Sequence, residues 1–255
     1  MIHCGSAFRR SCSPFKPLVQ EPRPKRGRGR PPKEDRLMLE AMLFVLRVAC
    51  PWRDLPDYFG PWSSVYTRWR RWNLNGVWAA ILDLLKEGAT GTLSFLDATH
   101  VKAHQDSTQS AAGKEREGIG KTKGGLNTKL TALVDSKGRA TQITLQAGNM
   151  ADITAADTIE IPAGLRIVAD KGYDSAAFRQ RIADAGSRSC IPPRKTRKNR
   201  VPWHRGHYRK RHRIENFFQR IKRFRRVGTR YEKHAVHFLA FVQLAAIMDW
   251  LKSPF

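Results

Sequence analysis

The sequence predicts an α/β domain that is preceded by a small all-helical domain. Three observations support this division. Residues 36–88 carry apolar side chains at helical spacing, residues 92–192 contain short alternating or apolar runs typical of strands, and residues 207–251 return to a helical pattern. Strands followed by helices in this mixture are typical of an α/β or α+β domain, which we expect over residues 89–255.

The composition points to a polyanionic partner. The 255 residues include 47 Lys and Arg against 22 Asp and Glu, giving a formal net charge of +25 at pH 7. Nucleic acid is the partner that this excess favours, and an anionic membrane surface is the weaker alternative. We expect no membrane association, because no apolar run reaches the ~18 residues that a membrane span needs.

Cysteine usage and the N-terminal residues suggest a cytoplasmic location. The four cysteines are scattered, and none lies in a C-x-x-C pair, so neither a zinc site nor a disulfide framework is indicated. The N-terminus is basic but lacks the apolar segment of a secretory signal. We therefore expect the protein to act in a reducing cytoplasm.

The first segment, residues 1–35, is predicted to be a basic, flexible arm. Prolines break any helix there, and the stretch from Gly27 to Pro32 combines glycine, arginine and proline. Such an arm can lie in a DNA minor groove, with Arg28 and Arg30 as its contacts. The alternative is a solvated leader with no binding role.

The second segment, residues 36–88, is predicted to be a helical DNA-binding domain. A mostly apolar helix ends before Pro51, a short helix or turn follows over residues 51–60, and Ser63 can cap a third helix. Val65, Trp69 and Trp72 face inward on that helix at 4/3 spacing.

The outer face of this third helix is basic. Its exposed positions are expected to contact DNA, as in a helix-turn-helix, and they are Arg68, Arg70 and Arg71. The alternative is a plain helical bundle whose arginines merely extend over apolar surface.

The third segment begins with strands. A strand over residues 92–99 carries Asp97, a polar stretch over residues 105–125 is expected to be a flexible loop, and residues 130–135 and 140–145 form a hairpin. Asp135 is expected to shape the hairpin turn.

The remaining elements alternate before the chain becomes helical. The expected order is a short helix at 152–160, a strand at 165–170 ending in Asp170, a helix capped by Asp174 or Ser175 and ending at Gly186, a strand at 189–192, a basic connector, and helices at 207–226 and 232–251.

Two carboxylates, Asp97 and Asp170, sit at or just after apolar strands. Sites in α/β proteins open at the carboxyl ends of strands, so both are candidate functional groups. Each aspartate taken alone is better explained as a turn former. A third acid, Glu215, changes this weighing.

Glu215 stands alone in a strongly basic, helix-forming stretch. On a helix of ~100° per residue, Tyr208, Arg211, Glu215 and Lys222 fall within an arc of roughly 60° beside an apolar stripe. A simple Arg211–Glu215 pair, contributing about 0.2–0.5 kcal/mol, explains only two of these four residues.

A metal-dependent site explains all four. Hard cations such as Mg²⁺ take oxygen ligands, and two such ions ~3.5–4 Å apart can stabilise the attacking and leaving oxygens of a phosphodiester displacement. Asp97, Asp170 and Glu215 could hold them, while Arg211 and Lys222 steady the phosphates. Tyr208 could contact a phosphate or stack on a base.

These residues resemble the DDE transposases of the bacterial insertion-sequence-five family. The signature Tyr-(2)-Arg-(3)-Glu-(6)-Lys is met in full by Tyr208, Arg211, Glu215 and Lys222. The segments around the two aspartates, Leu96–His104 and Val168–Ser175, are also similar to this family. The resemblance extends from about residue 27 to the end, whereas residues 1–24 do not resemble the usual start of a member.

The resemblance implies a ribonuclease H-like catalytic domain behind a helix-turn-helix-like domain. It implies that Asp97, Asp170 and Glu215 bind two Mg²⁺ (or Mn²⁺) ions and that the protein cuts double-stranded DNA at terminal inverted repeats and joins it to target DNA. It also implies a homodimer or higher oligomer on DNA. The alternatives are a non-catalytic DNA-binding relative and a nuclease of the same fold.

Overall fold

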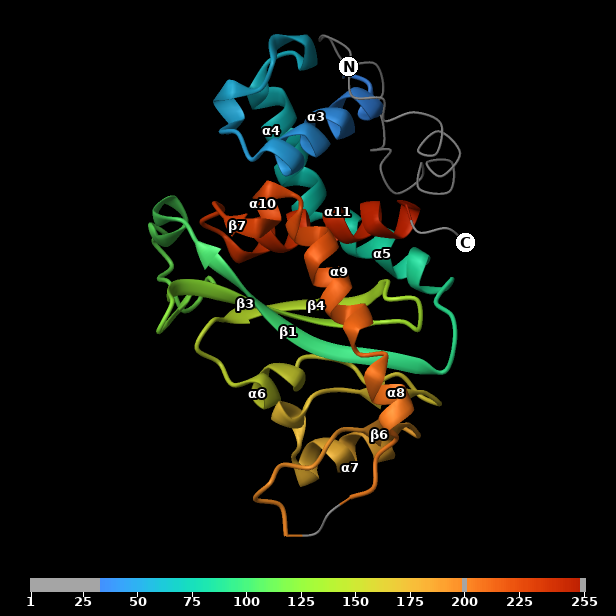
Figure 1. The fold of residues 1–255 in the computed structure, drawn as a ribbon. Helices are drawn as coiled ribbons and strands as arrows, with labels where there is room; N and C mark the ends of the chain where they lie inside the picture. The colour runs from blue at the N-terminus through green and yellow to red at the C-terminus, as the bar shows by residue number, and fades with distance from the viewer. Residues whose placement is uncertain (1–32, 199–200, 253–255) are drawn as a thin grey trace.

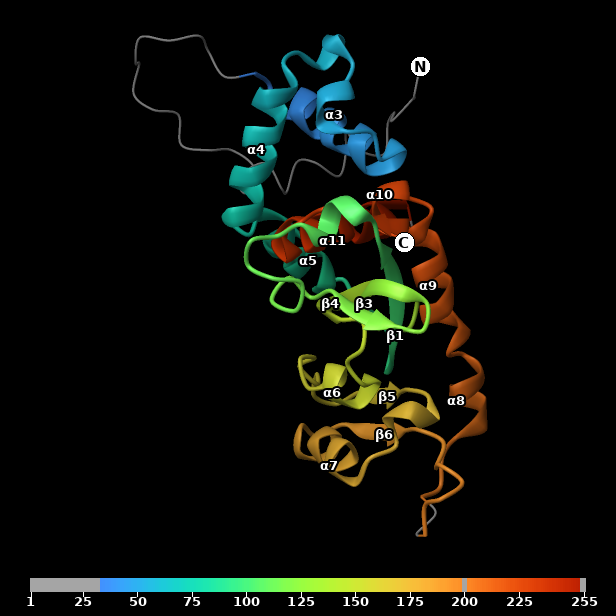
Figure 2. The same cartoon turned by 90° about the vertical axis from the view of Figure 1, so that its left-hand side faces the viewer.

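The computed structural model describes residues 33–198 and 201–252. Its elements form stacked layers around one sheet (Figure 1). The N-terminal helices lie at one end, a layer of C-terminal helices separates them from the sheet, and two short helices cover the opposite side. Figure 2 shows the same stacking from the side, so the sheet is covered on both faces.

The sheet combines an antiparallel meander with parallel strands. Strands β1 (Leu93–Ala103), β3 (Gly125–Val134) and β4 (Ala140–Ala147) are antiparallel neighbours, and β5 (Arg166–Val168) and β6 (Arg188–Cys190) continue parallel to β1. The spatial order along these five strands is therefore β4-β3-β1-β5-β6. This is the ribonuclease H-like arrangement that the resemblance implied, and it makes β1 the central strand.

The hairpin prediction is confirmed. The β3–β4 connection turns at Gly138, whose φ is +80°, and Asp135 accepts hydrogen bonds from the backbone N–H groups of Lys137 and Arg139. The Arg139 guanidinium pairs with the same carboxylate at 2.6 Å and lies over the Trp250 ring. Asp135 is thus a turn former, as its position before Gly138 suggested.

The N-terminal helices form as the apolar spacing indicated. Helix α3 (Asp35–Val48) buries Met38, Met42 and Val45, and two 3-10 turns, η1 (Trp52–Asp54) and η2 (Asp57–Phe59), occupy the predicted short helix or turn. Helix α4 (Trp62–Leu74) starts after Pro61, one residue before the predicted cap, and buries Val65, Trp69 and Trp72.

A further helix, α5 (Val77–Lys86), packs on the sheet layer. It contacts the C-terminal helix α11 (Ala235–Lys252) and strand β4, and its buried residues belong to the same core as those of α11. Trp69 of α4 stacks on Phe241 of α11 with ring centroids 4.1 Å apart. The core is therefore continuous across residue 88, where we expected a domain boundary.

Helix α11 corrects the expectation that no segment is long and apolar enough to span a membrane. Its 18 residues have a mean hydropathy of 1.3, which meets that requirement by length and composition. Figure 1 shows the helix between the sheet and the N-terminal helices. Its apolar character is explained by burial, since it contacts α4, α5, α9 and β4.

The far side of the sheet carries α6 (Asp152–Ala156) and α7 (Ala176–Asp184). Ser175 caps α7 by accepting the N–H of Phe178, which resolves the choice between Asp174 and Ser175. Asp174 is buried instead beside Arg179 and Arg197 and accepts the backbone N–H of Arg194 at 2.7 Å. It therefore fastens the basic connector to the loop that follows β5.

The predicted helix at 207–226 is broken into three pieces. They are α8 (Arg205–Arg209), α9 (His212–Lys222) and α10 (Arg225–Gly228), followed by the short strand β7 (Thr229–Arg230) that pairs with the end of β1. Helix α9 docks through its buried residues Ile214, Phe217, Phe218 and Ile221. The apolar stripe was predicted correctly, but the turn at residues 210–211 was missed.

Parts of the segment 105–125, where we expected a flexible loop, form regular elements. The segment contains a 3-10 turn, η3 (Gln105–Thr108), and strand β2 (Gly120–Thr122), which pairs with β3. Ile119 is buried, and the Glu117 carboxylate accepts the N–H of Ala235 at 2.6 Å. Polar side chains order this segment because they find partners at the start of α11 and inside the fold.

Candidate active site

The first predicted carboxylate, Asp97, lies in the middle of the central strand. Asp97 pairs with Ala132 of β3, and its position within a strand is as predicted, although the strand extends beyond the predicted end at residue 99. Strand β1 continues to Ala103 because its far half pairs with β3 and with β7. The Asp97 side chain is only 20% exposed.

The second carboxylate, Asp170, follows strand β5 as predicted. It caps the 3-10 turn η4 (Lys171–Tyr173) by accepting the N–H of Gly172 at 2.7 Å. Because β5 is parallel to β1 and pairs with its first residues, the chain leaves β5 next to Asp97. The two carboxylates are near enough that Asp170 raises the pKa of Asp97.

The third carboxylate, Glu215, lies on the first turn of α9, which packs on β1. Arg211 joins it to the strand: the guanidinium donates to Asp97 Oδ2 at 2.5 Å and also to Glu215 Oε1. The simple Arg211–Glu215 pair therefore exists, but the same guanidinium also holds Asp97. Arg211 is the cation that links the two carboxylates.

Lys222 fixes the other end of α9 to the same strand. Its ammonium donates to Thr99 Oγ1 at 2.7 Å and to the carbonyl of His100 at 2.8 Å. Burial lowers the pKa of Lys222. Arg211 and Lys222 thus contact β1 on either side of Glu215, one at Asp97 and one two to three residues further on.

Tyr208 lies on α8, before the break in the helix. Its ring packs edge-on against Trp203, with the ring centroids 5.0 Å apart. Burial tends to lower the pKa of Arg211, whereas Asp97, Glu215 and Tyr208 raise it. Of the signature residues, Tyr208 is therefore on α8, Arg211 is in the turn at residues 210–211, and Glu215 and Lys222 are on α9.

Burial dominates the electrostatics of Asp97. It raises the pKa of this carboxyl, while hydrogen bonds from Ala98 N–H and the neighbouring Arg211 oppose the rise. Burial also raises the pKa of Tyr173, helped by Asp97, Asp152 and Asp170. Its hydroxyl has no hydrogen-bond partner in the described residues. Tyr173 was missed as a site residue, although a tyrosine three positions after Asp170 was the available signal.

A shallow pocket of about 270 Å³ joins strand β1 to helix α9. Asp97, Thr99, Glu215 and Lys222 line it, together with Gln219, which follows Glu215 by one helical turn. Three predicted site residues therefore share one cavity. Gln219 was also missed, and its signal was its i+4 spacing from Glu215.

Most other predicted DNA contacts lie at the far end of the molecule. Arg70 and Arg71 are exposed on α4, whereas Arg68 is mostly buried, pairs with Asp35 and lies 5.8 Å from the Trp72 ring. The phosphate contact that we expected for Arg68 stays a prediction. Arg28 and Arg30 lie outside the described residues.

The carboxylates fit a hard divalent cation by donor chemistry. No group of three His, Cys, Asp or Glu side chains in residues 33–198 and 201–252 is arranged to hold a metal ion. Asp97 and Asp170 nevertheless place like charges close together beside the unpartnered Tyr173 hydroxyl. Arg211 already supplies positive charge to Asp97 and Glu215.

The sheet order and its carboxylates define a ribonuclease H-like domain, and comparison with known families agrees. Residues 88–250 match the family described as "Transposase DDE domain", and residues 13–82 match "Putative transposase of IS4/5 family". The chain belongs to the DDE-domain transposases of the IS4/5 type.

Relatives of this chain occur in several bacteria. A protein of Brucella ovis, named as a putative transposase for the insertion sequence element IS6501, is 34% identical over 134 residues, which cover 50% of this chain and all of that protein. An uncharacterised 16.2 kDa protein of the insertion element IS402 from Burkholderia cepacia is 43% identical over 76 residues, covering 28% of this chain and 51% of its own.

Solved structures with partial similarity are also transposases. A piggyBac transposase synaptic complex with hairpin DNA matches with a TM-score of 0.40 and 10% identity over 74% of this chain and 48% of that one. The Mos1 transposase paired-end complex matches with a TM-score of 0.25 and 11% identity over 84% of each chain.

Proposed function

We propose that this transposase cleaves DNA at the ends of an insertion sequence and transfers the freed strands to target DNA, with Asp97, Asp170 and Glu215 as its metal-binding triad. The observation that supports the assignment is the Arg211 guanidinium, which donates both to Asp97 on the central strand and to Glu215 on α9. Asp170 follows the parallel neighbour of that strand and is near enough to Asp97 to affect its pKa.

Asp97, Asp170 and Glu215 would hold two Mg²⁺ or Mn²⁺ ions, which when bound would stabilise charge on the attacking and leaving oxygens. The residues of the chain have their own tasks. Arg211 neutralises the negative charge of Asp97 and Glu215 while no metal is bound. Once a metal is bound, its guanidinium is suited to bind a substrate phosphate, because it donates hydrogen bonds in a bidentate geometry. Lys222 holds α9 against β1 and adds positive charge near the phosphates.

The proposed substrate is double-stranded DNA, namely the terminal inverted repeats and a target. The net charge of +25 supports it, as do the exposed Arg70 and Arg71 on α4. Acting on two ends at once requires two active sites, so we propose a homodimer or higher oligomer on DNA. The free thiols of Cys50 and Cys190 support action in a reducing cytoplasm.

The direct test is cleavage and joining of a duplex that carries the element's inverted ends. Glu215→Gln keeps the shape of the side chain but weakens it as a metal ligand. We expect it to abolish cleavage in Mg²⁺ while DNA binding is retained. Glu87→Gln, at an exposed position before the sheet, is the matched control and should cleave normally. Full cleavage by Glu215→Gln would falsify the assignment.

Two other functions are distinguished by the same assay. A nuclease of this fold gives cut products and no joined ones. A non-catalytic DNA-binding relative gives neither, although it shifts the duplex in a binding assay. We favour the transposase because a binding protein has no use for two carboxylates, Asp97 and Glu215, that share the Arg211 guanidinium, with Asp170 near the first of them.

A further inference from the structure

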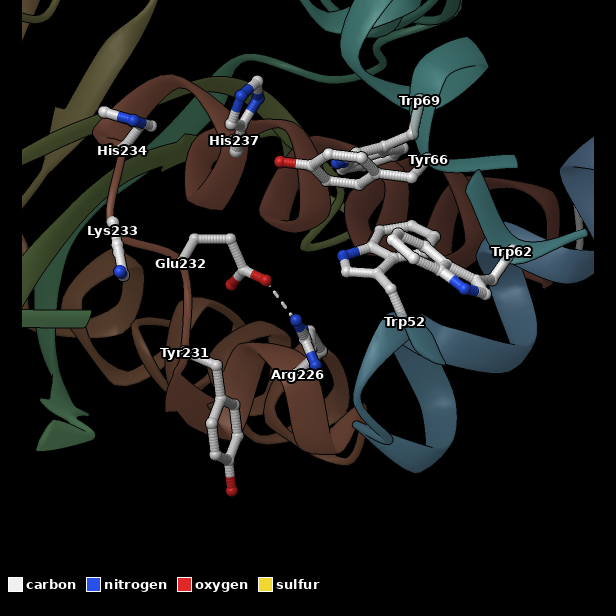
Figure 3. A pocket seen from close by; sticks show the side chains of 10 residues that line it. All are labelled: Trp52, Trp62, Tyr66, Trp69, Arg226, Tyr231, Glu232, Lys233, His234 and His237. Carbon is white, nitrogen blue, oxygen red and sulfur yellow. Dashed lines mark hydrogen bonds and ion pairs between the residues drawn. The ribbon is translucent and has the colours of Figure 1, made fainter. Parts of the chain in front are cut away.

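A second pocket lies between the N-terminal helices and the segment from α10 to α11. Its volume is about 370 Å³, within the range of small-ligand sites. One wall is aromatic: Trp52, Trp62, Tyr66 and Trp69 line it from η1 and α4. Figure 3 shows these four side chains grouped on one side of the pocket, and the Trp52 and Tyr66 rings are 5.4 Å apart.

Glu232 forms the opposite wall and is incompletely satisfied. Its side chain is 7% exposed, and Oε1 accepts from Arg226 at 2.7 Å. The other oxygen, Oε2, is buried with no hydrogen-bond partner among the described residues. A buried carboxylate oxygen without a donor is costly, so the pocket lacks an N–H or O–H group at this point.

Arg226 makes this wall rigid. Beyond Glu232, its guanidinium donates to the carbonyl of Cys50 at 2.9 Å and to that of Ala49 at 3.3 Å. These contacts tie α10 to the end of α3, directly before the residues that carry Trp52. The aromatic wall and Glu232 are therefore held at a fixed separation.

The rim of the pocket is basic. Lys233 and His234 line it and are exposed, and Arg226 already neutralises Glu232. An aromatic cage for a cationic ligand needs a net negative lining, which this pocket does not have. A flat, neutral ring attached to a negatively charged chain fits better, because the ring stacks on the tryptophans while the chain meets Lys233.

This pocket is separate from the carboxylate site but lies along the same strand. Ala103, at the end of β1, pairs with Arg230, directly before Tyr231 and Glu232. Six residues of strand separate Asp97 from Ala103, a rise of about 20 Å, or roughly six steps of B-form DNA at 3.4 Å each. DNA reacting at Asp97 could thus reach the pocket with a nearby nucleotide.

We propose that the pocket binds one unstacked nucleobase of the DNA, stacked on the Trp52 and Trp62 side, with an N–H of the base donated to Glu232 Oε2 and an adjoining phosphate at Lys233. The inference rests on the proposed action on DNA, yet it concerns binding alone. Every base has an aromatic face and at least one N–H donor, so the site accepts a base by shape and stacking.

The test is the affinity of the full chain for two fluorescein-labelled strands of 12 nucleotides, measured by anisotropy in EDTA. One strand is of mixed sequence, and the other has abasic sugars throughout. Trp62→Ala should weaken binding of the base-containing strand about tenfold, as expected for a lost stacking contact, and leave the abasic strand unchanged. Lys233→Gln should weaken both strands equally.

Tyr58→Ala is the matched control, since Tyr58 is 67% exposed on η2, four residues before Trp62, and lies outside the pocket. It should bind both strands as the parent does. Equal losses in Trp62→Ala and Tyr58→Ala, or equal affinity of the parent for both strands, would overturn the proposal. A fluorescence-quenching experiment gives a further check. The proposal would also be overturned if tetramethylammonium protected the pocket tryptophans from a quencher and the DNA strand did not.

Because the assay excludes metal, its outcome is independent of catalysis. A chain that binds bases at Trp62 but fails to cut DNA refutes the proposed function and keeps this inference. A chain that cuts and joins DNA but binds the abasic strand as tightly as the base-containing strand supports the proposed function and refutes this inference.

Discussion

The Arg211 guanidinium donates to the Asp97 carboxylate at 2.5 Å, across 114 positions of sequence. The contact joins the middle of the central strand to the start of α9, and Glu215 shares the same guanidinium. A positive side chain therefore sits between two of the three carboxylates proposed to hold metal. Any cation that binds both must compete with Arg211 or displace it.

Removing that guanidinium should weaken the metal-free protein and strengthen its response to metal. We expect Arg211→Gln to lower the free energy of unfolding by about 1–2 kcal/mol, because Asp97 is left facing Asp170 without its partner. Mg²⁺ should then stabilise the variant more than the parent. Denaturant unfolding with and without Mg²⁺ checks both effects. Arg223→Gln, an exposed charge-matched control, should match the parent.

The hairpin turn should reject a side chain at Gly138. Its φ is +80°, and a Cβ there would lie 3.0 Å from the carbonyl oxygen of Arg213 on α9. Gly138→Ala should cost about 1–2 kcal/mol from the left-handed backbone alone and more from the contact. Gly164→Ala is the control, because its φ is +74° but nothing lies within 4 Å. Equal losses in thermal unfolding would show that the contact contributes nothing.

Asp174 should contribute to the acid stability of the fold. Burial alone raises its pKa, but hydrogen bonds from Arg194 N–H and Arg179 outweigh it, so the folded pKa lies below the ordinary value. A depressed carboxyl pKa stabilises the fold above the unfolded pKa of about 3.9, and this stability is lost as pH falls through the folded pKa.

The variant Asp174→Asn should therefore be less stable than the parent at pH 6, and the difference should shrink as pH falls below about 4. Urea unfolding across this pH range measures it. Asp184→Asn removes an exposed acid at the end of α7 and should leave the dependence of the free energy of unfolding on pH almost unchanged. A difference that is constant with pH would contradict the assignment.

Arg230 should not be replaceable by lysine. Its side chain is fully buried and donates to the carbonyls of Glu117, Glu232 and Lys233 and to Thr128 Oγ1. A lysine ammonium cannot reach all four acceptors in the plane of a guanidinium. We expect Arg230→Lys to lose about 2–4 kcal/mol, with faster tryptic cleavage in residues 105–125. Arg188→Lys, on an exposed side chain, should behave as the parent.

The parts of the fold that rest on apolar spacing could be predicted. The buried side of α9, the β3–β4 hairpin and the inward tryptophans of α4 all follow from the period of their side chains. The central position of Asp97 did not, because a strand buried on both sides continues through polar residues when its neighbours supply hydrogen bonds. The elements within residues 105–125 were not predicted because their partners are distant in sequence, as Ala235 is for Glu117.

The candidate site was predictable as a set of residues but not as a geometry. The spacing of Arg211, Glu215 and Lys222 placed them on one face, and that face does lie against β1. Nothing in the spacing indicated that Arg211 would bond to Asp97, or that Arg68 would be held by Asp35, since both partners are distant in sequence. The pocket around Glu232 is hidden for the same reason, as its two walls come from opposite ends of the chain.

Helix α11 also sets an order of events during synthesis. Trp69 and α5 are made about 150 residues before the helix that covers them, which at 5–20 residues per second leaves them unshielded for roughly 8–30 s. Until Phe241 and Trp250 leave the ribosome, the aromatic cluster and the back of the sheet have no cover. A ribosome that stops before Ala235 therefore releases a chain whose aromatic core is open, because Trp69 has not yet met Phe241.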